Sequence, residues 1–97
     1  MATYITLTQF TQQGAQQIKN LPAVAEKNIE NFKKLGIELR SWHVTMGQYD
    51  LVVVFDAPND ETAAKVALAV GMQGNARPQT MRAFSLDELK KLVGTLP

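Results

Sequence analysis

Residues 37–55 read IELRSWHVTMGQYDLVVVF, two strand-like runs on either side of a short polar turn. Ile37–Met46 and Tyr49–Phe55 are rich in β-branched and aromatic residues, as strands are. Gly47-Gln48 between them is typical of a tight turn. This stretch predicts a β-hairpin in the middle of the chain.

The segment before the hairpin predicts one strand and one long helical region. Residues 3–10 read TYITLTQF and alternate as a strand does. From residue 11 to residue 35, apolar side chains recur every three or four positions, which predicts a helix with one apolar stripe. Pro22 falls within this stripe and predicts a kink or a short turn. Gly36 is expected to end the helix.

The segment after the hairpin predicts a helix, a strand and a short C-terminal helix. Pro58 and the acidic residues after it are typical of a helix start, and this helix should run to about Gly71. Residues 79–84 form the expected last strand. Ser85 followed by Glu88 predicts a capping box for a terminal helix that closes near residue 94, with Phe84 placed to pack on Leu89.

The predicted order is βαββαβ plus a terminal helix. This order indicates an α+β fold of the ferredoxin-like type, with a four-stranded antiparallel sheet and both long helices on one face. Ninety-seven residues, of which 45% are hydrophobic and 20% charged, are an ordinary composition for one globular domain. We therefore expect a single domain over residues 1–97.

Charge and composition argue against several classes of protein. Ten basic and nine acidic residues give a net charge of +1, and the basic residues are scattered, which argues against nucleic-acid binding. The sequence has no apolar run of membrane-spanning length and no export signal, so we expect no membrane partner. The absence of cysteine fits a cytoplasmic protein.

Several of these features together resemble the GYD domain family. They are Gly47-Gln48-Tyr49-Asp50 ahead of an apolar strand, Pro58 with its acidic residues, and residues 80–84, TMRAF. The family is similar in fold to the dimeric α+β barrels. The resemblance implies a ferredoxin-like fold and self-association; it assigns no catalytic residue, cofactor or substrate to this chain.

Five residues are candidate ligand-binding residues. Tyr49 and Asp50 either stabilise the turn or line a pocket at the end of the sheet. Thr6, Trp42 and Arg82, with Tyr4 and Thr8, are expected on the sheet face that the helices leave uncovered. Arg82 would there bind a carboxylate or phosphate group, or pair with an acidic residue across an interface.

His43 is the single histidine of the chain and neighbours Trp42 on the opposite face of the predicted strand. One histidine without cysteine or a carboxylate motif cannot supply the three or four ligands of a zinc site, so we expect no metal. A role for His43 with haem or as a general base would follow only by analogy with enzymes of the barrel fold. We expect a packed or surface histidine.

The sequence predicts a homo-oligomer, with a dimer as the first choice. Leu51–Phe55 is apolar on both faces of its strand, so one face needs a partner. The leading functional hypothesis is a homo-oligomeric small-molecule-binding, regulatory or stress-related module. The alternatives are a cofactor-independent or haem-type enzyme, such as a monooxygenase, and a purely structural assembly subunit.

Overall fold

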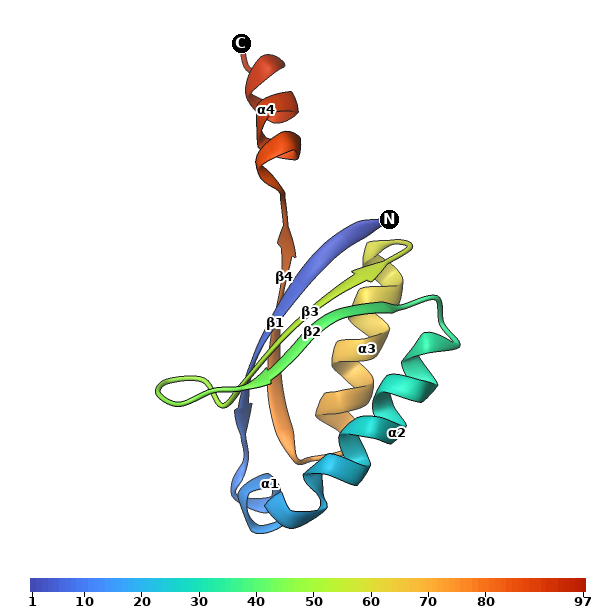
Figure 1. The fold of residues 1–97 in the computed structure, drawn as a ribbon, viewed down its shortest axis with the longest axis vertical. Coiled ribbons are helices and arrows are strands. Elements are labelled where there is room, and N and C mark those ends of the chain that lie inside the picture. The colour runs from blue at the N-terminus through green and yellow to red at the C-terminus, as the bar shows by residue number, and fades with distance from the viewer.

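A computed structural model describes all 97 residues. The chain folds as β1 (Ala2–Phe10), α1 (Gln12–Gln16), a 3₁₀ turn (Ile18–Asn20), α2 (Leu21–Lys33), β2 (Glu38–Val44), β3 (Leu51–Ala57), α3 (Asp60–Met72), β4 (Ala76–Ala83) and α4 (Leu86–Gly94). The strands form one antiparallel sheet in the order β2-β3-β1-β4 (Figure 1). The predicted α+β, ferredoxin-like architecture is confirmed.

Pro22 predicted a kink or a short turn in the region between β1 and β2, and the structure has a turn there. A short helix and a 3₁₀ turn precede α2, and Pro22 lies in the first turn of α2, where its missing N–H costs no hydrogen bond. Gly36 follows the end of α2 with a φ of 90°, a conformation that favours glycine.

Two boundaries differ from the expectation. The hairpin connection is the six-residue segment between Val44 and Leu51. Within it, the Asp50 N–H donates to the Thr8 carbonyl of β1, and the Asp50 carbonyl accepts from the Thr45 N–H. Strand β4 begins at Ala76 and contains Pro78, which pairs with Thr8. Proline is tolerated there because β4 is an edge strand with one free side.

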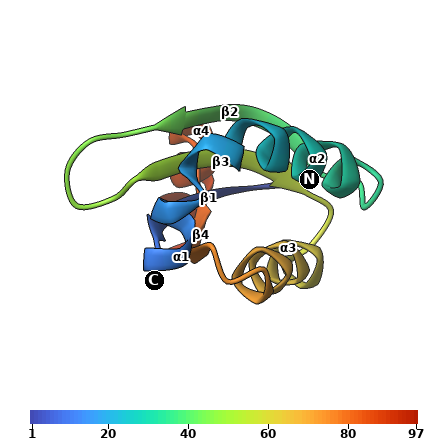
Figure 2. The same cartoon turned by 90° about the horizontal axis from the view of Figure 1, so that it is seen from below.

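The tightly packed core lies at one end of the sheet. It consists of five buried residues, Tyr4, Ile37, Phe55, Ala57 and Ala63. Tyr4 and Phe55 stack with ring centroids 5.6 Å apart. Helix α2 packs near β2 and α3 packs on β4, so the two helices cover opposite edges of the same face (Figure 2).

Helix α4 projects from the end of β4, away from α2 and α3 (Figure 1). It makes no extensive contact with the other elements, and it stretches the chain to 50 Å along its longest axis. None of the helices is both long enough and apolar enough to cross a membrane.

Candidate functional site

Tyr49 and Asp50 lie in the hairpin loop and tie it to the end of β1. The Asp50 carboxylate accepts a hydrogen bond from the Phe10 N–H at 2.8 Å, and the Asp50 N–H donates to the Thr8 carbonyl at 2.8 Å. The Thr45 hydroxyl donates to the Tyr49 carbonyl at 2.6 Å. Asp50 is therefore occupied in fixing the loop against the sheet.

Gly47 gives this loop its shape. Its φ is 111°, which side-chain-bearing residues rarely adopt, and a Cβ at this position would meet no atom within 4 Å. Backbone conformation, not crowding, requires glycine here. The neighbouring Tyr49 hydroxyl reaches across the sheet toward Gln79 Oε1, 3.5 Å away.

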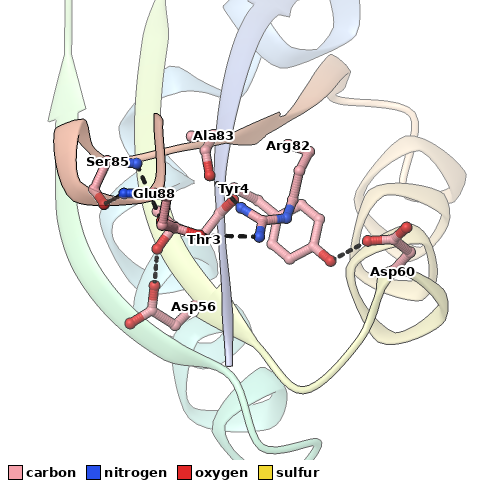
Figure 3. Close-up of polar contacts among 8 residues, drawn as sticks. All are labelled: Thr3, Tyr4, Asp56, Asp60, Arg82, Ala83, Ser85 and Glu88. Atoms are coloured by element: carbon pink, nitrogen blue, oxygen red, sulfur yellow. Dashed lines mark hydrogen bonds and ion pairs between the residues drawn. The ribbon is translucent and has the colours of Figure 1, made fainter. Parts of the chain in front are cut away.

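Arg82 lies where β4 passes into α4 (Figure 3). Its guanidinium stands 4.4 Å from the ring centre of Phe84 and 5.9 Å from that of Tyr4, and it forms an ion pair with Glu88 at 3.3 Å. Of the two roles that the sequence left open for Arg82, ligand binding or an ion pair across an interface, the structure shows an ion pair, and its acidic partner comes from the same chain. Arg82 is in register with the buried Tyr4, so its expected place on the uncovered face was wrong. Arg82 holds the first turn of α4 against the end of the sheet.

The capping box predicted for α4 is present. Ser85 Oγ accepts a hydrogen bond from the Glu88 N–H at 3.1 Å, and the Glu88 carboxylate accepts one from the Ser85 N–H at 3.1 Å (Figure 3). The Ser85 N–H, with a further contribution from Arg82, lowers the pKa of Glu88 below its ordinary value. A local polar network therefore fixes the start of α4 without support from the hydrophobic core.

Two buried polar residues of the sheet also have partners. The Tyr4 hydroxyl donates to the Asp60 carboxylate, and this hydrogen bond, with burial of the phenol, raises the pKa of Tyr4 (Figure 3). Asp56 accepts a hydrogen bond from the Thr3 hydroxyl at 2.6 Å and pairs with Arg40 at 2.6 Å. The Thr3 hydrogen bond is the main cause that lowers the pKa of Asp56, while burial opposes it.

Thr6 and Trp42 face the helices, contrary to the expectation that they would lie on the uncovered sheet face. Tyr4 and Thr8 are buried on the same covered side. The covered face accepts these polar groups because their hydroxyls find partners or open space: Tyr4 pairs with Asp60, and Thr6 with Thr80 at 3.1 Å. The assignment of the two faces of β1 was therefore wrong.

Thr6 and Trp42 line a cavity of about 580 Å³ between the sheet and helices α2 and α3. The α2 wall carries the side chains of the predicted apolar stripe, and the α3 wall is also apolar. The main apolar residues of these walls are Leu21, Val24, Ala25, Ile29, Phe32, Val66, Ala67 and Val70. The two candidate residues that share this cavity come from β1 and β2.

The opposite face of the sheet has no helix over it, and its centre is apolar. We call it the bare face; the strand registers place Ile5, Leu7, Val52, Val54 and Met81 on it. His43 pairs with Val52 at the β2 edge and is exposed there, which is one of the two environments, packed or surface, that the sequence left open. The structure holds no group of three or more histidine, cysteine, aspartate or glutamate residues arranged to bind a metal ion.

Helix α4 is the second exposed apolar surface. It is amphipathic, and its apolar side chains stand in solvent: Leu86 is 67% exposed and Leu89 48%. The other exposed apolar residues of this segment are Leu92, Val93 and Leu96. Such a contiguous surface on a protruding helix is typical of a protein-binding element.

The sequence profile of the GYD domain matches residues 4–93. The chain belongs to the GYD domain family. A relative from Thermus thermophilus, a glutamine synthetase and cystathionine β-lyase binding protein, is 29% identical over 90 residues, which cover 92% of this chain and 95% of the relative. No solved structure matches the chain.

In this member of the GYD domain family, the glycine and aspartate of the G-x-Y-D motif have local structural roles. Gly47 bends the loop, and Asp50 joins it to β1. Sequence reasoning missed the cavity, because its width depends on how far apart α2 and α3 settle on the sheet. The apolar stripe of α2 was the one local signal for its wall.

Proposed function

We propose that this GYD domain is a regulatory protein-binding module that works as a homo-oligomer. Its two exposed apolar surfaces have separate roles: the bare face binds a second copy of the chain, and α4 binds a partner enzyme. The observation that carries the proposal is α4, a capped amphipathic helix held away from its own domain.

The bare face fits a second copy because its centre is apolar and no helix of the same chain covers it (Figure 2). Ile5 and Leu7 of β1 lie beside Val54 and Val52 of β3, so the two central strands present a continuous apolar strip. Two such strips, related by a two-fold axis, can cover each other. Each valine or leucine buried this way stabilises the dimer by about 1.5–3 kcal/mol before the cost of association.

A protein partner for α4 is supported by the relative from Thermus thermophilus. The name of that protein states that it binds two enzymes, glutamine synthetase and cystathionine β-lyase, and its similarity extends over nearly the whole of both chains. An amphipathic helix binds by laying its apolar face into a groove of its partner. In α4 that face is formed by leucine and valine side chains that its own domain does not cover.

The test is direct binding, by isothermal titration calorimetry, to purified glutamine synthetase and cystathionine β-lyase from the organism that encodes this chain. Leu89→Gln removes an apolar side chain from the α4 stripe, and we expect it to weaken binding at least tenfold. Lys91→Gln places the same residue on the same helix at a polar position and serves as the matched control. Wild-type protein that binds neither enzyme, or Leu89→Gln protein that binds as the wild type does, would contradict the proposal.

A further inference from the structure

The cavity beneath α2 and α3 has the size of a ligand site. Its volume is about 580 Å³, whereas side chains in folded domains normally leave few spaces larger than one water molecule. Small-molecule sites typically occupy about 300–1,000 Å³. The side chains of this domain therefore leave room for a molecule that is not part of the chain.

The lining of the cavity selects an uncharged molecule. Four aromatic side chains contribute to the walls: Phe10, Phe32, Trp42 and Phe55. The charged lining residues are Lys33 and Glu38, which lie close in sequence around the end of α2 and are both exposed. No buried charge can neutralise an ionic ligand inside, and an unpaired charge in an apolar site is strongly unfavourable.

One polar group on the sheet wall of the cavity is available to such a ligand. Thr8 is 2% exposed and lines the cavity, and its hydroxyl takes part in none of the side-chain hydrogen bonds of the protein, whereas that of Thr6 is taken by Thr80 at 3.1 Å. No fully buried side-chain oxygen or nitrogen is left without a partner, so the Thr8 hydroxyl opens onto the cavity. A ligand that fills the cavity would bury this hydroxyl, and buried hydroxyls are normally hydrogen-bonded. A ligand with one hydroxyl or carbonyl group at the sheet would satisfy Thr8 and leave the rest of its surface to apolar contacts.

We propose that this cavity binds a neutral, mostly apolar, ring-containing small molecule whose single hydroxyl or carbonyl group pairs with Thr8. The inference deepens the proposed function, since this molecule would be the regulator of the binding module. The walls that would hold it are joined by an amide pair: Gln73 Nε2 donates to Asn28 Oδ1 at 3.0 Å, and Asn28 Nδ2 donates to Gln73 Oε1 at 3.4 Å. This pair ties α2 to the end of α3.

Trp42 makes the test direct, because it is the one tryptophan of the chain and lines the cavity. Energy transfer from Trp42 to a pyrene probe reports binding beside it. Three probes separate the effects of the ring system, the hydroxyl group and a negative charge on binding: pyrene, 1-hydroxypyrene and pyrene-1-carboxylate. We expect 1-hydroxypyrene to bind with one molecule per chain, pyrene about two- to tenfold more weakly for want of the hydrogen bond, and the carboxylate most weakly.

Thr8→Val keeps the shape of the side chain and removes the hydroxyl, so 1-hydroxypyrene and pyrene should then bind equally. Ala67→Phe, on the α3 wall, should fill part of the cavity and weaken both probes at least tenfold. Ala64→Phe makes the same change at an exposed position of α3 that does not line the cavity, and should bind as the wild type does. Circular dichroism establishes that each variant is folded.

Absence of energy transfer to 1-hydroxypyrene in the wild type would overturn the inference. Tightest binding of the carboxylate would also overturn it. So would a preference for 1-hydroxypyrene over pyrene that is as large in Thr8→Val as in the wild type. These outcomes are distinct from failure of the proposed function. Loss of oligomerisation or enzyme binding with intact 1-hydroxypyrene binding would refute the proposed function alone, and the reverse result would refute the cavity ligand alone.

Discussion

Neighbouring residues of β3 should respond in opposite ways to a new charge. Val53 lies on the helix-covered face and lines the cavity, whereas Val52 lies on the bare face. Aspartate at position 53 would bring an unpaired carboxylate among apolar side chains, which costs about 3–5 kcal/mol. The whole domain is expected to be stable by about 5–15 kcal/mol, so Val53→Asp should remove a large share of its stability.

Val52→Asp leaves the interior of the subunit unchanged and acts on association. In a symmetric face-to-face dimer the substitution occurs twice and removes the burial of two valines, about 1.5–3 kcal/mol each. Because about 1.4 kcal/mol corresponds to a tenfold change in affinity, the dissociation constant should rise about 10²- to 10⁴-fold. The expected product is a folded monomer.

Light scattering coupled to size-exclusion chromatography at micromolar concentration measures the assembly, and urea denaturation followed by circular dichroism measures stability. Wild type should exceed the 10.7 kDa mass of one chain, and Val52→Asp should elute as a folded species of that mass. A wild-type mass of one chain would refute the reasoning. So would Val52→Asp protein that assembles as the wild type does, or Val53→Asp protein as stable as the wild type.

Three further substitutions test individual contacts. Ser85→Ala removes the acceptor for the Glu88 N–H and should destabilise α4 by about 0.5–2 kcal/mol, seen as faster amide hydrogen exchange of Leu89; unchanged exchange would argue against the cap. Asp56→Asn should lower stability at pH 7 by about 1.5–3 kcal/mol, because it replaces a buried carboxylate that accepts two hydrogen bonds. The pKa of Asp56 in the folded protein lies below the ordinary 3.8, so the carboxylate stabilises the fold fully above pH 3.8 and loses this effect as the pH falls through the folded pKa. The urea midpoints of wild type and Asp56→Asn should therefore converge on acidification. A difference between the midpoints that stays constant with pH would contradict the pairing. His43→Gln, at an exposed position of an edge strand, should change stability by less than about 0.5 kcal/mol and leave the metal content, measured by mass spectrometry, unchanged; stoichiometric metal lost in the variant would overturn this.

Local signals in the sequence predicted the elements well where a few neighbouring residues decide the structure. The Ser85 and Glu88 side chains cap α4 because both partners lie within one turn. Gly36 ends α2 for a similarly local reason. The start of β4 was misplaced because Pro78 is acceptable only on an edge strand, and strand order is a property of the whole sheet.

The candidate site was harder to predict because alternation shows that a strand has two faces without showing which one the helices cover. On β1, Tyr4, Thr6 and Thr8 lie on the covered face, and the aliphatic pair, Ile5 and Leu7, lies on the bare face. The usual expectation that apolar residues face the helices is reversed there, since Asp60 and Thr80 satisfy the hydroxyls of Tyr4 and Thr6. Those partners are more than fifty residues away in sequence, so no local pattern reveals them.

The two proposed sites share β3 as their common wall. Val53 and Phe55 line the cavity, while Val52 and Val54 lie on the bare face, so one strand would contact the small molecule on one side and the second copy on the other. A strand packed on both sides cannot shift toward one partner without changing its fit to the other, because packed interiors deform little. If the ligand changes the affinity between the two copies, association must change ligand affinity by the same factor. Regulation of assembly by a small molecule would then need no element beyond the sheet itself.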